Sequence, residues 1–81
     1  MTDLLYPLKQ LKVGERAVIA KLHQANDYTH RKLKTLGLTL GKTITLEQNF
    51  PRYIIRLGSN RVPLSPELLS VVSVRITNRI S

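Results

Sequence analysis

The chain has 81 residues, with 13 lysines and arginines against 5 aspartates and glutamates, so its formal net charge is +8. This length allows one hydrophobic core that buries only about 60–65% of the unfolded surface, which argues against a deeply enclosed active site. The chain has no cysteine, which excludes disulfides, thiolate metal sites and cysteine nucleophiles, while the positive charge favours an acidic protein face, a nucleic acid or an anionic lipid surface as partner.

No targeting or membrane-spanning segment is evident. The first residues place Asp3 where a signal peptide carries positive charge, and Pro7 ends their apolar run. No apolar run approaches the roughly 20 residues that cross a bilayer. We therefore expect a cytoplasmic protein without direct membrane insertion.

The first part of the chain predicts a turn, a strand and the start of a helix. Residues 7–13 are expected to form one irregular turn that docks two leucines on the core. Residues 17–22 are apolar on both sides of the strand alternation, which predicts a central strand. Asn26 or Asp27 is a suitable N-cap for a helix that ends at Leu36.

The most informative stretch runs from Arg31 to Leu46. Gly37 follows the last helical leucine, at the position where a left-handed residue without a Cβ commonly ends a helix. Leu38 is then placed to fold back on the last helical turn. After Gly41 the apolar period changes to alternation, which predicts a strand over Thr43–Gln48. A helix, two glycine turns and a strand therefore follow one another within a short stretch.

The following residues predict a hairpin. Residues 50–52 suit a turn, and residues 53–57 are rich in β-branched and aromatic side chains, as strands are. Residues 58–60 read Gly-Ser-Asn and predict a tight turn. Residues 61–64 are expected to form a short strand, which Pro63 confines to an edge of the sheet.

The chain is expected to end with a helical turn and one more strand. Ser65 is expected to cap a turn that begins at Pro66, and residues 71–76 to form the last strand. Five short strands with one inserted α-helix and a short C-terminal helical turn predict a mainly β fold. We expect a small SH3-like β-barrel, because closure removes the exposed edges of a flat sheet.

The whole chain, 1–81, is expected to be a single monomeric domain, with its structured part in 7–76 and a frayed tail in 77–81. The side chains expected in its core are Leu33, Leu36, Leu38, Ile44 and Leu57.

The order of residues along most of the chain resembles a known family. Leucines precede a glycine, an alanine and an isoleucine follow in the first strand, and a basic pair leads to Leu-Gly-Leu and a further glycine. The matching residues are Leu8, Leu11, Gly14, Ala17, Ile19, Arg31, Lys32, Leu33, Leu36, Gly37, Leu38, Gly41, Ile44, Pro51, Leu57, Gly58, Val62, Leu64 and Val74. This pattern resembles FeoA, and also the SH3-like C-terminal domain of iron-dependent repressors of the diphtheria toxin repressor type.

The resemblance carries expectations about function. It implies an accessory protein of bacterial ferrous iron transport, without a cofactor, that docks on the cytoplasmic G-protein domain of the FeoB permease. The chain departs from the family pattern at four points. Lys32 replaces a commoner arginine, Leu40 a frequent proline and Pro63 the usual alanine, and the hairpin near Pro51 is short.

The densest basic cluster is formed by Arg31, Lys32, Lys34 and Lys42. One interpretation is a docking patch for an acidic face, in which Leu40 supplies an exposed apolar contact. The other interpretation is the solvated side of an amphipathic helix. The sequence leaves both open.

A second possible site consists of His23, Asp27 and His30. On one continuous helix their spacings of about one turn would place them on one face, as in a metal site. We expect a loop to separate His23 from the other two, and therefore predict no metal site. A metal-sensing regulatory domain remains an alternative function.

A third group combines Arg52, Tyr53, Arg56 and Arg61 near Phe50. Arginines mixed with exposed aromatic rings are typical of proteins that bind single-stranded nucleic acid, so a nucleic-acid-binding SH3-like barrel is another alternative. Both aromatic residues equally suit the core, and we do not expect nucleic acid to be the main partner. No nucleophile-elbow or phosphate-loop motif is present, so we predict no enzyme.

Overall fold

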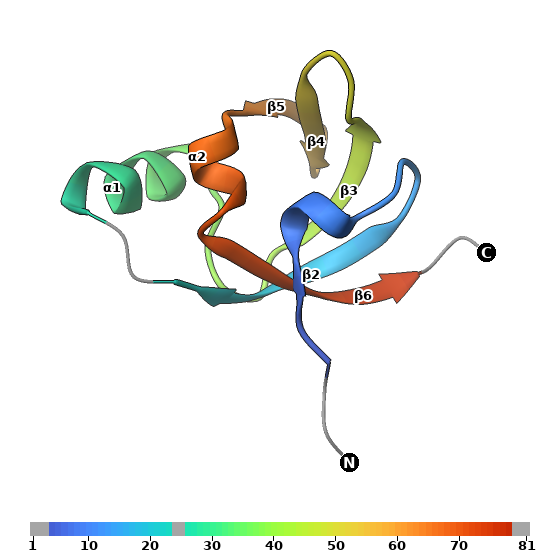
Figure 1. Cartoon of the computed structure of the whole chain (residues 1–81), viewed down its shortest axis with the longest axis horizontal. Coiled ribbons are helices and arrows are strands. Elements are labelled where there is room, and N and C mark those ends of the chain that lie inside the picture. Colours follow the sequence, from blue (N-terminus) through green and yellow to red (C-terminus); the bar gives the residue numbers. More distant parts are fainter. Residues whose placement is uncertain (1–3, 24–25, 79–81) are drawn as a thin grey trace.

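Six strands form one antiparallel sheet in the computed structural model, which describes residues 4–23 and 26–78 (Figure 1). The strand order is β1-β6-β2-β3-β4-β5. In chain order the elements are β1 (Tyr6–Pro7), the 3-10 helix η1 (Leu8–Gln10), β2 (Arg16–Leu22), α1 (Asp27–Leu36), β3 (Thr43–Gln48), β4 (Tyr53–Leu57), β5 (Asn60–Leu64), α2 (Pro66–Leu69) and β6 (Val72–Asn78).

The predicted mainly β architecture is confirmed, with β1 as an additional strand. Its two residues, Tyr6 and Pro7, pair with β6, and so short a segment gives no alternation in the sequence. β6 also extends past the predicted end of the last strand. Thr77 and Asn78, expected in a frayed tail, belong to this strand, and Asn78 lies opposite Arg16 of β2. The remainder of the predicted tail, 79–81, lies outside the described residues.

Among the described residues the sheet runs from β1 at one edge to β5 at the other, and Figure 1 shows that it curls between these two edges. Pro63 lies on β5, the edge position that its missing N–H requires. Across this region the Tyr53 hydroxyl on β4 donates a hydrogen bond of 2.6 Å to the carbonyl oxygen of Leu8. A side-chain hydrogen bond thereby ties β4 to η1.

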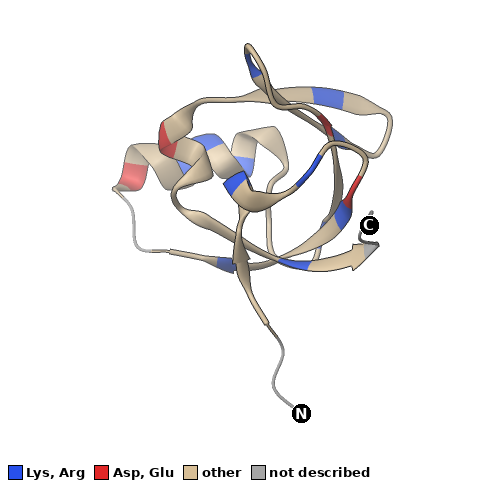
Figure 2. Cartoon of the chain, turned by 45° about the vertical axis from the view of Figure 1, so that its right-hand side comes forward, with Lys and Arg blue, Asp and Glu red and all other residues tan. Residues whose placement is uncertain are grey.

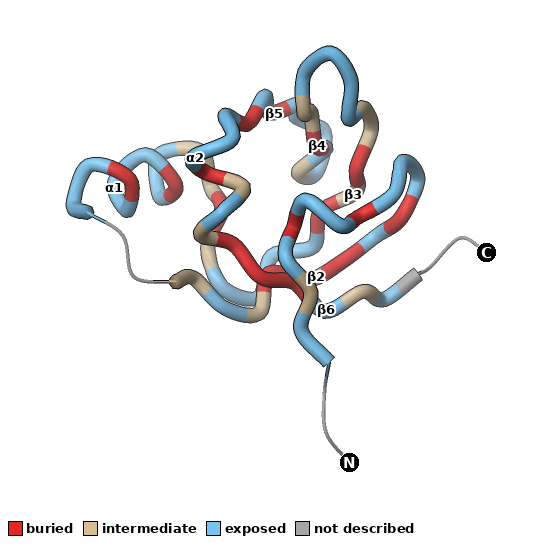
Figure 3. Tube along the Cα trace, viewed as in Figure 1, coloured by how far each residue is buried: buried red, intermediate tan, exposed pale blue. Residues whose placement is uncertain are grey.

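The core lies inside the curl of the sheet (Figure 3). Three of the predicted core side chains, Leu33, Leu38 and Ile44, are fully buried. Leu36 and Leu57 are only half-buried and pack against the edge of the core. Both were predicted to lie in the core, and the structure places them at its edge, because each is the last residue of its element and is covered on fewer sides.

Helix α1 begins and ends as the sequence predicts. The Asn26 side chain caps its start by accepting a hydrogen bond of 2.7 Å from the backbone N–H of Thr29. Gly37 has a φ of +86°, and the N–H of the next residue, Leu38, donates to the carbonyl oxygen of Leu33 at 2.9 Å. This is the Schellman arrangement, and it turns Leu38 into the core.

Gly37→Ala should destabilise the domain more than Gly41→Ala. Both glycines have left-handed backbone, with φ of +86° and +87°, so each alanine should cost about 1–2 kcal/mol in strain. At Gly37 the added Cβ would also lie 3.0 Å from Cδ2 of Leu57, whereas at Gly41 no such neighbour lies within 4 Å. Urea unfolding of both variants measures the difference, and equal losses would show that Leu57 moves aside freely.

Candidate functional site

Helix α1 is held against the rest of the domain by buried side chains and by a side-chain hydrogen bond. Leu33 is buried in the core, and the Thr29 hydroxyl donates to Oε1 of Glu67 on α2 at 3.1 Å. Figure 1 shows the two helices next to each other at one side of the sheet. The residues on the outer side of α1 are therefore fixed in place and open to a partner.

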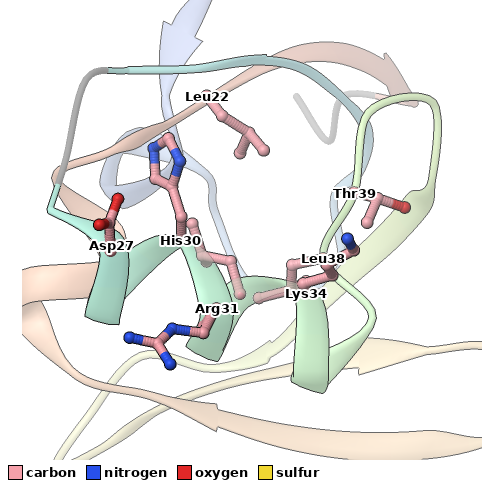
Figure 4. Close-up of a pocket in the computed structure, with 8 residues that line it drawn as sticks. Leu22, Asp27, His30, Arg31, Lys34, Leu38 and Thr39 are labelled. Carbon is pink, nitrogen blue, oxygen red and sulfur yellow. The ribbon is translucent and has the colours of Figure 1, made fainter.

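A groove of about 470 Å³ runs along one flank of α1, between this helix, the end of β2 and the turn after Gly37; we call it the first groove. Its lining consists of Leu22, Asp27, His30, Arg31, Leu33, Lys34, Leu38 and Thr39. In Figure 4 the ring of His30 points from α1 toward Leu22, while Arg31 points to the other side of the helix. Apolar side chains and basic groups thus meet in one groove.

The structure divides the basic cluster of Arg31, Lys32, Lys34 and Lys42, which we call the α1 basic cluster, between the two flanks of the helix. All its members are exposed, but only Arg31 and Lys34 line the first groove. Lys32 lies on the other flank, with its Nζ 5.9 Å from the centre of the Tyr28 ring. Lys42 comes later, after the turn that follows the helix.

The turn after Gly37 is hydrogen-bonded to β2, and its tip projects into solvent. The N–H of Gly41 donates to the carbonyl oxygen of Ile19 at 2.8 Å. The N–H of Ile19 in turn donates to the carbonyl oxygen of Lys42 at 2.9 Å. Leu40 at the tip is 61% exposed. An apolar side chain of this size at a fixed and exposed position suits a contact with a partner.

Figure 2 shows that the acidic residues of the chain are few and set among many basic ones. Three of the carboxylates serve the fold itself. Glu15 is fully buried, Glu67 accepts the hydrogen bond from α1, and Glu47 pairs with Arg56 at 2.7 Å and with Arg61 at 2.9 Å. The carboxylates that remain near the basic side chains of α1 are those of Asp27, which lines the first groove, and of Glu67.

The structure does not gather His23, Asp27 and His30 into one site. His23 follows β2 and lies outside α1, and its Nε2 forms a hydrogen bond of 2.5 Å with the Ser73 hydroxyl. Asp27 and His30 are exposed and border the first groove. In the described part of the chain no three metal-binding side chains form a group.

Calorimetric titration with Fe²⁺ or Zn²⁺ at neutral pH should detect no site tighter than the micromolar range, which corresponds to a binding free energy of about −8 kcal/mol. The physical reason is that Asp27 and His30 alone supply too few ligands for a closed coordination shell. His30→Ala is the matched control. A tight stoichiometric site that this variant abolishes would contradict the prediction.

Sequence reasoning missed an interaction between two polar residues, the buried Glu15 and the half-buried Tyr53. Oε1 of Glu15 accepts a hydrogen bond of 2.8 Å from the N–H of Lys12. The pKa of Tyr53 is raised to about 12, first because burial disfavours its charged form and then because Glu15 is negative. Tyr53 is thus half-buried with its hydroxyl committed to Leu8, whereas Phe50 is 83% exposed. Of the two interpretations that the sequence left open for Phe50, a core residue or an exposed ring, the structure shows the exposed ring.

Tyr53→Phe should cost about 0.5–1.5 kcal/mol near neutral pH, through loss of the hydrogen bond to Leu8. Below about pH 10 the tyrosine is protonated in both the folded and the unfolded chain, so its contribution is complete. As the pH rises from about 10 to about 12, only the unfolded chain releases the proton, and this contribution is lost.

Urea unfolding of the wild type and the Phe variant, at neutral pH and at about pH 11, checks this. The difference in stability between the two should shrink at the higher pH, because only the wild type carries the hydroxyl that titrates. A constant difference would contradict the raised pKa.

The chain matches a known family over most of its length. The model of the FeoA domain matches residues 6–76. The Fe(2+) transport protein A of Leptolyngbya boryana is 35% identical over 71 residues, which are 86% of this chain and 87% of that protein. In the described residues no helix is long and apolar enough to cross a membrane.

Solved structures confirm the predicted SH3-like fold. The crystal structure of an iron uptake regulatory protein (FeoA) is similar with a TM-score of 0.81 and 26% identity, over 91% of this chain and 99% of that chain. IdeR of T. acidophilum is similar with a TM-score of 0.88 and 16% identity, over 95% of this chain and 36% of that chain. This second similarity is one of fold.

Proposed function

This chain belongs to the FeoA family, and we propose that it is a cytoplasmic accessory protein of bacterial ferrous iron uptake that docks on the cytoplasmic G-protein domain of the FeoB permease. The names of two similar proteins, one for Fe(2+) transport and one for iron uptake regulation, support the role in iron uptake. In this proposal the protein binds its partner and catalyses no reaction.

The observation that carries the docking proposal is the pairing of fixed basic groups with accessible apolar surface along α1. Arg31 and Lys34 border a groove in which Leu22 is partly exposed, and Leu40 projects from the adjoining turn. Charge of this kind speeds the encounter with an acidic face, whereas apolar burial holds the complex together. The α1 flank offers both on one surface.

The double variant Arg31→Glu/Lys34→Glu should keep the fold, because exposed substitutions usually change stability by about ±0.5 kcal/mol. It should nevertheless bind the isolated cytoplasmic domain of the permease more weakly at low salt, mainly through slower association. Surface plasmon resonance at low and at high ionic strength, with melting curves alongside, measures both effects.

The matched control is Lys9→Glu/Lys21→Glu, which changes the net charge by the same amount on η1 and β2. Both of its residues are exposed and outside the first groove. The proposal requires a clearly smaller loss of association rate in this control. An equal loss of association rate in both double variants would show that only net charge matters. The α1 basic cluster would then be the solvated face of the helix and not a docking patch.

One observation favours a second candidate function, binding of single-stranded nucleic acid. Phe50 is almost fully exposed and lies two residues from Arg52, as a base-stacking ring beside a phosphate contact would. Pull-down from membranes that contain the permease, set beside binding to random single-stranded DNA, separates the two functions. Tight DNA binding without recovery of the permease would favour this second function.

A further inference from the structure

A second groove, of about 540 Å³, runs along the opposite flank of α1. It lies between this helix, the turn that joins β3 to β4, and the connection from β5 to α2. Lys32 borders it from the helix and Arg52 from the turn. The first groove and the second groove thus share the helix but no lining residue.

The floor of the second groove is apolar and poor in hydrogen-bond donors. Pro51, Pro63 and Pro66 line it, and proline has no backbone N–H. Leu64 and Leu68 complete the floor, at 6% and 3% exposure. Such a floor favours a large apolar side chain, since a polar group would have to reach Asn49 or Ser65 elsewhere in the lining to find a partner.

The rim of the second groove is basic. Lys32 and Arg52 are exposed, and the lining contains no carboxylate. Glu67 lies between Pro66 and Leu68 in the chain but is not part of the lining, and its carboxylate accepts a hydrogen bond from the neutral hydroxyl of Thr29 on α1. Phe50, 83% exposed, adjoins the rim at Pro51 and extends its apolar surface. A ligand that matches this groove is apolar at its centre and acidic on both sides.

We infer that the second groove binds an extended segment of another protein, in which a large apolar side chain is flanked by carboxylates. The carboxylates would pair with Lys32 and Arg52, the arginine in a bidentate contact. A second copy of this chain fits less well, because two molecules of charge +8 repel each other. This inference does not depend on the proposed docking to the permease through the first groove.

The test is an NMR titration of the ¹⁵N-labelled chain with the synthetic peptide Gly-Asp-Glu-Leu-Phe-Asp-Glu-Gly. Signals of Arg52, Leu64 and Leu69 should shift, while those of Leu22 and Thr39 in the first groove should stay. The affinity should fall with added salt. It should also fall when the peptide's acidic residues become amides, or when its Leu-Phe pair becomes Ala-Ala.

Arg52→Glu should lower the affinity for the peptide about tenfold. Lys21→Glu, an equal change of charge on β2 outside both grooves, should have little effect on this affinity. Phe50→Ala provides a second variant that keeps the fold, since its ring is almost fully exposed. Unchanged binding in both Arg52→Glu and Phe50→Ala would overturn the inference.

Three further outcomes would also overturn it. The first is a set of shifts confined to the first groove. The second is that random single-stranded DNA binds at Arg52 more tightly than the peptide does. The third is dimerisation in analytical ultracentrifugation that Arg52→Glu abolishes, because a second copy would then be the occupant of this groove.

Discussion

The stop of α1 at Gly37 is the local constraint on which the surface of this domain depends. A residue with a Cβ is strained at a φ of +86°, and here the backbone reversal brings the N–H of Leu38 to the carbonyl oxygen of Leu33. Leu38 then enters the core, and the following turn pairs with Ile19 of β2. The helix is thereby fixed between the turn on one flank and α2 on the other, and a groove forms along each.

The distribution of charge follows from what the few carboxylates do inside the fold. Glu47 binds both Arg56 and Arg61, so the basic group on the hairpin is partly neutralised by its own sheet. Glu15 is buried, and its negative charge helps to keep the Tyr53 hydroxyl protonated. The net charge of +8 is accordingly displayed on the outside, where it favours acidic partners over further copies of the chain.

Local signals made much of the fold predictable. The alternation in residues 43–48 and the glycine after Leu36 act through neighbours along the chain, so β3 and the end of α1 lie at the predicted residues. The cap at Ser65 also holds, because its side chain accepts a hydrogen bond from the N–H of Leu68. Interactions of this kind depend only on residues that lie close together in the chain.

Features that depend on distant segments were not predictable in this way. No pattern marks Glu15 as buried or Phe50 as exposed, because both depend on how the sheet curls. The helical period alone separates Lys32 from Arg31 and Lys34. That each flank faces a groove follows instead from α2 and the β3–β4 turn, which lie far along the chain.

The central claim is that the α1 surface of this FeoA-family protein is where an iron permease docks. Methyl cross-saturation NMR tests it most directly, with leucine and valine methyl groups labelled in this chain and the unlabelled cytoplasmic domain of FeoB irradiated. Our account predicts strong saturation transfer to Leu40 and Leu22, beside the first groove, and little to Val13, which is also exposed but lies before β2. Transfer to Val13 without transfer to Leu40, in a complex of confirmed stoichiometry, would contradict the account.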